Sequence, residues 1–197
     1  MWLEKQIERI SFFPFFLISS IAFYTIVVLR AKTVPFTHDE TATFYYFIQN
    51  GHYMPFYAHL DTNNHILNSM LTHWSYQLFG DSKFALRLPN LIFTLFFIYG
   101  TYKVSGHLKK NISKIVLILF FFFSYNWVTF FSVSRGYGLS FASMAMGISF
   151  CLSYFKTGRL LDVILFCFWM QLALAASLII LPVFCIFLGL VLLYQFS

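Results

Sequence analysis

Two adjacent carboxylates and a histidine, in the run His38-Asp39-Glu40, follow the first long apolar segment of the chain by a few residues. The sequence has only 7 acidic residues in 197, so an acidic pair beside a membrane exit is the first candidate for chemistry. A carboxylate in such a place can act as a general base toward an acceptor. The structural alternative is that the two acids stabilise the N-terminal end of a helix over residues 41–49. The residues alone leave both interpretations open.

Two arginines are the natural counterparts of these acids. Arg135 lies in Ser134-Arg135-Gly136-Tyr137 between two apolar runs, and Arg87 lies at the start of another run. A cation at that depth is costly unless it is paired or faces a polar cavity, and a guanidinium can bind a phosphate bidentately. The alternative for both is that the side chain extends to the lipid headgroups. Acids and arginines together predict a two-part site, with a base for an acceptor and a cradle for a lipid phosphate.

The histidines gather in the same part of the chain. All except His107 lie between residues 31 and 86, namely His38, His52, His59, His65 and His73. A metal or haem site is one hypothesis for them, but His65 and His73 stand about two helical turns apart, too far for one ion on an unbroken helix. The three cysteines fall in apolar runs without a ligand spacing, and we interpret Cys151, Cys167 and Cys185 as small core residues.

The composition excludes a soluble protein of this size. The chain is 59% hydrophobic and 22% aromatic, with 10% charged residues and a mean hydropathy of +0.74. A polytopic membrane protein is the class that fits. The formal charge of +6 comes mainly from short basic tracts beside apolar runs, which is typical of topology signals and not of nucleic-acid binding.

The elements that must position these residues are transmembrane helices. Apolar runs of spanning length lie at about 11–30, 87–105, 112–131, 137–155, 160–177 and 180–197. The fold class is therefore all-α, a polytopic helical bundle with about six spans. Residues 1–197 form a single transmembrane domain, and no soluble domain is expected. The first run follows a charged head and lacks a small-residue cleavage site, so it predicts an uncleaved anchor.

The basic residues set the orientation. Three clusters fall on one side if the N-terminus is cytoplasmic, namely Lys5/Arg9, Lys103/Lys109/Lys110/Lys114 and Lys156/Arg159. The loop over about 31–86 is then external. Within it, residues 64–79 have apolar side chains at helical spacing but are too polar to span, which predicts an amphipathic helix at the outer interface. A second interfacial helix is expected over 41–49, ending at Asn50-Gly51.

An ordered series of short motifs resembles the GT-C superfamily of glycosyltransferases, which use lipid-phosphate-linked sugars. The similarity is to protein O-mannosyltransferases, aminoarabinose transferases and related bacterial enzymes. The motifs are His38-Asp39-Glu40, Asn63-Asn64-His65-Ile66-Leu67-Asn68, Leu78-Phe79-Gly80-Asp81-Ser82, Leu86-Arg87-Leu88-Pro89-Asn90 and Ser134-Arg135-Gly136-Tyr137. They cover about residues 35–140, and the predicted topology places all of them outside.

The resemblance implies a function and roles for individual residues. Asp39 would be the catalytic acid that binds or activates the acceptor, with support from Glu40. In some relatives such acids hold a divalent metal, which makes Asp39 a candidate ligand. The groups implied at the phosphate of a polyprenyl-phosphate sugar donor are His65, Arg87, Arg135 and Tyr137. The protein would act in a bacterial cytoplasmic (inner) membrane, as a multi-pass protein in contact with the bilayer.

The chain departs from the family pattern in two motifs and in length. Ile66 and Gly136 stand where relatives commonly have proline. Family members usually have more spans and often a C-terminal external domain, so we expect this chain to be an N-terminal portion that needs a missing C-terminal part or a partner subunit. The alternative from another class is a non-catalytic polytopic protein, such as a lipid-carrier transporter or an assembly subunit, that binds a lipid head without turnover.

Overall fold

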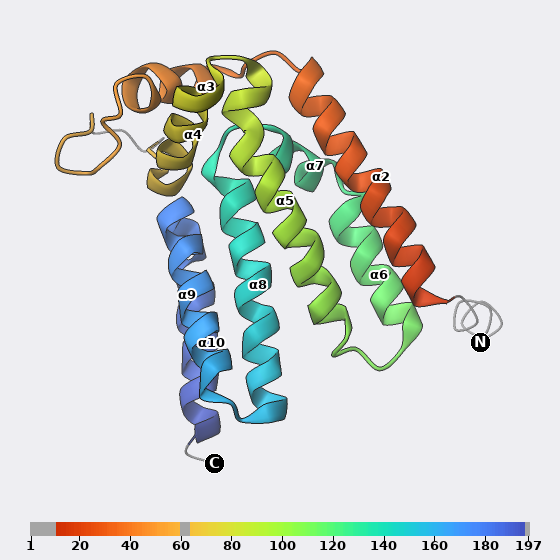
Figure 1. The fold of residues 1–197 in the computed structure, drawn as a ribbon. Coiled ribbons are helices and arrows are strands. Elements are labelled where there is room, and N and C mark those ends of the chain that lie inside the picture. The colour runs from red at the N-terminus through yellow and green to blue at the C-terminus, as the bar shows by residue number, and fades with distance from the viewer. Residues whose placement is uncertain (1–10, 60–63, 196–197) are drawn as a thin grey trace.

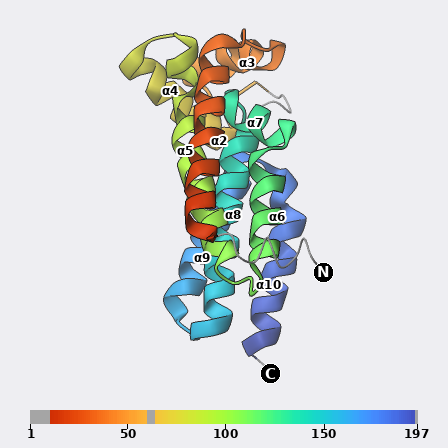
Figure 2. The ribbon, with the colours of Figure 1, turned by 90° about the vertical axis from the view of Figure 1, so that its right-hand side faces the viewer.

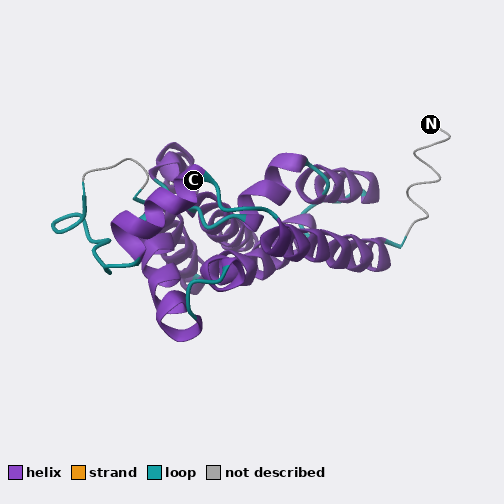
Figure 3. Ribbon diagram, turned by 90° about the horizontal axis from the view of Figure 1, so that it is seen from above, coloured by secondary structure: helices purple, strands orange, loops and turns teal. Residues whose placement is uncertain are grey.

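The computed structural model describes residues 11–59 and 64–195, and every regular element within these ranges is helical (Figure 3). The longer helices are α2 (Phe12–Thr33), α4 (Ile66–Phe79), α5 (Lys83–Ser105), α6 (Asn111–Phe122), α8 (Gly136–Thr157), α9 (Leu160–Ala176) and α10 (Leu181–Gln195). The shorter ones are α3 (His38–Thr43), the π-helical turn η1 (Phe44–Ile48), α7 (Tyr125–Ser132) and the 3-10 turn η2 (Leu178–Ile180). The cluster Lys5/Arg9 and Asn63 lie outside the described residues. The all-α prediction is confirmed.

Four helical segments of the described chain are long and apolar enough to cross a membrane, namely α2, α5, α8 and Leu178–Gln195. The pair α6 and α7, bent by 53°, makes a fifth if it counts as one span. The prediction of about six spans was too high by this measure. Hydropathy does not register the extended backbone of Ser124 (ψ 132°), which divides the run 112–131, and α9 has only 17 residues. Helices of this kind are consistent with a multi-pass membrane protein.

The spanning helices lie side by side, with α8 packed between α5 and α9 (Figure 1). On the other side of α5, α2 packs against α5, α6 and α7. Small residues allow the closest approach between α5 and α8, because a Cβ built on Gly100 would lie only 2.9 Å from the backbone of Ala145 and Met146. Such small-residue contacts are typical of helix packing in membranes.

Two apolar clusters hold the bundle together. In the first, Phe23 of α2 stacks on Phe122 of α6 with ring centroids 4.9 Å apart, and Phe131 of α7 packs on Phe97 of α5 at 4.7 Å. The second joins α8, α9 and α10 around buried residues such as Phe166 and Met170. The interpretation of the cysteines as core residues holds in part: Cys151 is buried in the second cluster, Cys167 is partly buried and Cys185 is exposed.

The segment between α2 and α5 forms helices that cover one end of the bundle (Figures 1 and 2). The helix expected over 41–49 begins at His38 as α3, continues as η1 and stops before Asn50-Gly51. Its start is a capping box, in which the Thr37 hydroxyl accepts a hydrogen bond from the Glu40 amide and the Glu40 carboxylate accepts one from the Thr37 amide. Glu40 therefore stabilises the N-terminal end of this helix, which is the structural alternative given for the acidic pair.

The predicted amphipathic helix over 64–79 is present as α4, and its polar face points into the bundle. Its buried residues are largely polar, including Asn68, Thr72 and Ser75. Its exposed residues include large apolar side chains, among them Trp74 and Leu78. A helix that faced water would expose the polar side, so α4 presents an apolar surface to its surroundings.

Candidate functional site

Glu40 and Arg87 form a fully buried ion pair at the covered end of the bundle. The Arg87 Nε and Nη2 atoms each donate to a different carboxylate oxygen of Glu40 at 2.8 Å. Nη1 also donates to the carbonyl oxygens of Ala31 and Val34, both at 2.9 Å, and Nη2 donates to that of Pro35 at 3.0 Å. All five N–H groups of the guanidinium are thus directed at the protein.

The Glu40 carboxylate is equally occupied. Besides Arg87 it accepts hydrogen bonds from the Thr37 amide at 3.0 Å and from the Ser134 amide at 2.7 Å. Burial disfavours its ionised form, but the hydrogen bonds from Arg87, Thr37 and Ser134 outweigh this, and the pKa of Glu40 lies below its usual range. In this geometry the polar atoms of both side chains are buried and bonded within the protein, so the expected catalytic role of Glu40 and phosphate-binding role of Arg87 do not fit their surroundings. The pair joins α2, α3, α5 and the start of α8.

Asp39 forms the second ion pair, with Arg135, and this pair is open. Its carboxylate is 48% exposed and contacts the Arg135 guanidinium, which is 11% exposed. The ring of His38 lies with Nδ1 3.7 Å from Asp39 Oδ1 and is almost fully exposed. The hydrogen bond and charge of Arg135 hold the pKa of Asp39 below its usual range despite the opposing effect of burial. Asp39 is therefore ionised at neutral pH and reachable from outside.

His65 and Tyr137 continue this open site from the other side of Arg135. The Arg135 guanidinium carbon lies 5.4 Å from the centroid of the Tyr137 ring, and that ring meets the His65 ring edge-on at 5.1 Å. His65 Nδ1 lies 2.9 Å from the carbonyl oxygen of Ala176, so the neutral imidazole donates from Nδ1 and keeps a lone pair on Nε2. Burial, and then the Arg135 charge, lower the pKa of His65 against the effect of the Ala176 carbonyl.

A cavity of about 300 Å³ lies against His65 and Tyr137. Its other walls are Asn64, Ile66 and residues 174–179, where the chain leaves α9 and turns into η2. Gly136 brings these parts together, because a Cβ at this position would lie 2.1 Å from the Ala176 carbonyl oxygen and 2.6 Å from the His65 ring. This close approach leaves no room for a side chain at position 136.

The segment 133–135 that carries Arg135 has no helical hydrogen bonds of its own and is held by the surrounding helices. Glu40 accepts from the Ser134 amide, and Asn68 of α4 donates to the Ser134 carbonyl at 3.4 Å. Asn90 of α5 donates to the Val133 carbonyl and, at 3.3 Å, to that of Arg135. Three elements therefore fix the backbone from which the Arg135 side chain reaches Asp39.

These bracing residues were not among the predicted site residues. Asn90 lies inside an apolar run, and an amide there is costly unless it is bonded, which is the signal that points to a role. Asn68 and Thr72 stand at helical spacing on one face of α4, and Thr72 reaches the Ser134 hydroxyl at 3.2 Å. A polar face on an otherwise apolar helix indicates a polar partner inside the bundle.

The histidines do not assemble into a metal centre within the described residues, where no group of three or more His, Cys, Asp or Glu side chains comes together. His73 is engaged elsewhere, since its Nδ1 lies 2.6 Å from the carbonyl oxygen of Ile48. The described groups nearest to the candidate ligand Asp39 are His38 and Arg135.

Comparisons with known proteins do not assign the chain to a family. No protein-family model, curated protein or solved structure matches the chain.

Proposed function

We propose that the chain is the catalytic core of a GT-C type membrane glycosyltransferase, which transfers a sugar from a polyprenyl-phosphate donor to an acceptor. The observation that carries this proposal is the contrast at residues 39 and 40. Glu40 is locked in a buried pair, while Asp39 remains half-exposed and is held by Arg135, which lies against Tyr137 in the wall of a cavity. A carboxylate and a guanidinium in such an open pair supply a base and an anion ligand side by side.

The donor phosphate would enter by exchanging with Asp39 on Arg135. A phosphate oxygen pair suits the planar guanidinium at least as well as one carboxylate does. Once the phosphate occupies Arg135, Asp39 loses the partner that lowers its pKa and becomes a stronger base beside the donor. Donor binding thus prepares the base, and no carboxylate is freed until the sugar is in place.

The transfer then needs one proton and one bond exchange. The acceptor hydroxyl attacks the anomeric carbon of the sugar while Asp39 takes its proton, and the bond between that carbon and the phosphate oxygen breaks. The leaving polyprenyl phosphate carries one more negative charge than the donor phosphodiester did, and Arg135 lies where it can stabilise this charge. His65 Nε2 and the Tyr137 hydroxyl are the groups for orienting the sugar or phosphate in the cavity.

The surroundings of the site support a membrane-surface substrate. The apolar outer side of α4 fits an interfacial helix, as the sequence predicts. Between α4 and α5 lies an apolar groove of about 270 Å³, lined by side chains that include Leu71, Trp74, Leu78 and Ile92, which suits a prenyl chain. With a cytoplasmic N-terminus this end of the bundle faces the outside of a bacterial inner membrane.

A second candidate is a non-catalytic carrier of polyprenyl phosphate. The observation in its favour is that Asp39 and Arg135 neutralise each other, so the site closes in the absence of ligand without any reaction. In such a protein Arg135 would release Asp39 when polyprenyl phosphate binds, and would pair with Asp39 again when the lipid leaves. The two candidates share the phosphate on Arg135 and differ in what Asp39 does.

Donor binding is tested by the thermal shift of the purified chain in detergent with a polyprenyl-phosphate sugar. Arg135→Ala should abolish the saturable stabilisation, Asp39→Asn should keep it, and Lys83→Ala and Asp81→Asn are charge-matched controls from the same end. Transfer to a hydroxyl acceptor separates the candidates: Asp39→Asn should reduce it by about 100-fold or more in an enzyme. Stabilisation that survives Arg135→Ala would contradict both.

A further inference from the structure

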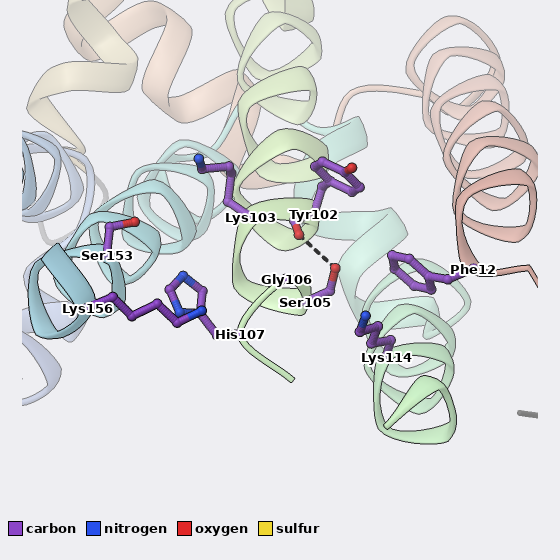
Figure 4. Close-up of a pocket in the computed structure, with 9 residues that line it drawn as sticks. All are labelled: Phe12, Tyr102, Lys103, Ser105, Gly106, His107, Lys114, Ser153 and Lys156. Carbon is purple, nitrogen blue, oxygen red and sulfur yellow. Dashed lines mark hydrogen bonds between the residues drawn. The ribbon is translucent and has the colours of Figure 1, made fainter. Parts of the chain in front are cut away.

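A second cavity lies at the other end of the bundle, with a volume of about 380 Å³ (Figure 4). Its walls come from the last turn of α5 and the loop after it, from α6, from the end of α8 and from Phe12 at the start of α2. Arg87 and Lys103 are both on α5, sixteen residues apart, so this cavity is about 24 Å along the helix from the buried ion pair. It shares no residue with the site described above.

The polar lining of this cavity is basic. Lys103, Lys114 and Lys156 line it from three different helices, and His107 lines it as well (Figure 4). No carboxylate is among the lining residues, and within residues 11–59 and 64–195 none of the three ammonium groups forms an ion pair. The Lys114 ammonium lies over the face of Phe12, at 5.3 Å from the ring centroid.

The imidazole of His107 lines the same cavity as the lysines. Burial, and then the charges of Lys156 and Lys103, lower the pKa of this imidazole. The two serine hydroxyls are neutral and do not offset the charge; Ser105 donates to the Tyr102 carbonyl at 2.7 Å and Ser153 donates to that of Ser149 at 3.0 Å. Three like charges facing one hollow repel one another, and an anion placed among them removes that repulsion.

We propose that this cavity is a binding site for a phosphate-bearing anion. A monovalent carboxylate would neutralise only one of the three lysines, whereas a phosphate group offers more charge and several acceptor oxygens to ammonium donors. The cavity also lies at the ends of spanning helices, where basic pockets meet lipid headgroups. The phosphate belongs either to an anionic phospholipid or to a soluble phosphate ester. This inference is independent of the proposed transfer reaction.

The test compares two double variants of equal charge. Lys103→Gln with Lys156→Gln removes two cations that line the cavity, and Lys109→Gln with Arg159→Gln removes two from the same end that do not line it. The soluble probe is inorganic pyrophosphate, titrated against the full chain in a neutral detergent, with acetate as the monovalent comparison. The lipid probe is phosphatidylglycerol in phosphatidylcholine nanodiscs, with the retained lipid counted by native mass spectrometry.

The expected result is saturable binding that weakens about tenfold or more in the cavity variant and stays unchanged in the matched one. Retention of phosphatidylglycerol without pyrophosphate binding identifies a lipid headgroup as the ligand, and pyrophosphate binding alone identifies a soluble one. Binding of neither probe by the native chain, or equal loss in both double variants, overturns the proposal and leaves only diffuse surface charge.

A third variant covers the case in which the cavity double variant does not fold. Ser153→Glu places a carboxylate among the three lysines, which should pair with them and stabilise the chain while excluding the anion. Loss of binding together with a raised thermal midpoint is expected. Unchanged binding in Ser153→Glu would contradict a site in this cavity.

Discussion

Asp39 and Glu40 are adjacent in the chain, and each pairs with an arginine, yet the two pairs have opposite properties. Successive residues of a helix point about 100° apart, so Glu40 turns into the bundle toward Arg87 while Asp39 turns outward toward Arg135. In the inner pair every guanidinium donor is bonded, and both side chains are buried from solvent. The outer pair is partly exposed, and Tyr137 beside Arg135 lines a cavity. The comparison shows that one pair fixes the architecture and the other remains exchangeable.

Breaking the inner pair should have the largest effect. Glu40→Gln or Arg87→Leu leaves an uncompensated buried charge, and we expect a loss of about 3–5 kcal/mol in the free energy of unfolding. The measurement is denaturant unfolding of the purified chain in detergent. The double variant should lose clearly less than the sum of the single losses, because neither charge is then left alone. Additive losses would mean that the two groups do not act as a pair.

Adding a side chain at Gly136, next to the outer pair, should have the next largest effect on stability. Gly136→Ala forces apart the Ala176 carbonyl and the His65 ring, at an expected cost of about 1–3 kcal/mol in unfolding free energy. Gly189→Ala, in α10, is the matched control because nothing lies within 4 Å of the added Cβ there. It should be neutral or stabilising, by up to about 1 kcal/mol. Equal effects at both positions would refute the packing argument.

Acidification should produce a smaller loss that depends on His65. Because the folded state lowers the pKa of His65, the unfolded chain binds this proton first as the pH falls below about 6.5. The contribution of His65 to stability is therefore complete above that pH and decreases as the pH falls toward the folded pKa. Unfolding midpoints measured from pH 7.5 to 5.5 should fall less steeply in His65→Gln than in the native chain. His52→Gln, at an exposed position, is the control variant.

Neutralising the outer carboxylate should have the smallest effect on stability. Asp39→Asn removes a half-exposed pair, for which we expect a change within about 1 kcal/mol in the same unfolding assay. This is the same chemical change as Glu40→Gln one residue away, so the two variants measure the comparison directly. If Asp39→Asn destabilised the chain as much as Glu40→Gln, the outer pair would be structural as well.

The sequence was sufficient for the elements that carry the site. Periodicity predicted a helix over residues 64–79, where α4 spans Ile66–Phe79, and the Asn50-Gly51 signal marked the end of η1. The apolar runs predicted the all-α class, and four to five helices among the described residues are long and apolar enough to cross a membrane. The sequence also singled out His65, Arg135 and Tyr137, which the fold brings into contact around the Tyr137 ring. These features depend on local pattern, which a single sequence contains.

Pairing between distant residues could not be predicted in the same way. Nothing in the local pattern distinguishes Arg87 from Arg135, and only the path of the chain assigns one to Glu40 and the other to Asp39. The break at residues 123–124 was missed because backbone geometry, not hydropathy, divides that run. Lys103, Lys114 and Lys156 were interpreted as topology signals. That they line one cavity depends on how the ends of α5, α6 and α8 are placed in space.

The buried pair also bears on how the protein is made. The groups that enclose the Arg87 guanidinium are Ala31, Val34, Pro35 and Glu40, and all of them precede Arg87 in the chain. An arginine without partners inserts into a membrane at a cost of about 2.5–3.5 kcal/mol at mid-helix. During synthesis, however, α5 emerges only after the residues that accept hydrogen bonds from Arg87. The Arg87 charge can therefore be paired as α5 enters the membrane. The first half of the chain is therefore expected to be a self-sufficient unit of insertion, to which the later helices are added.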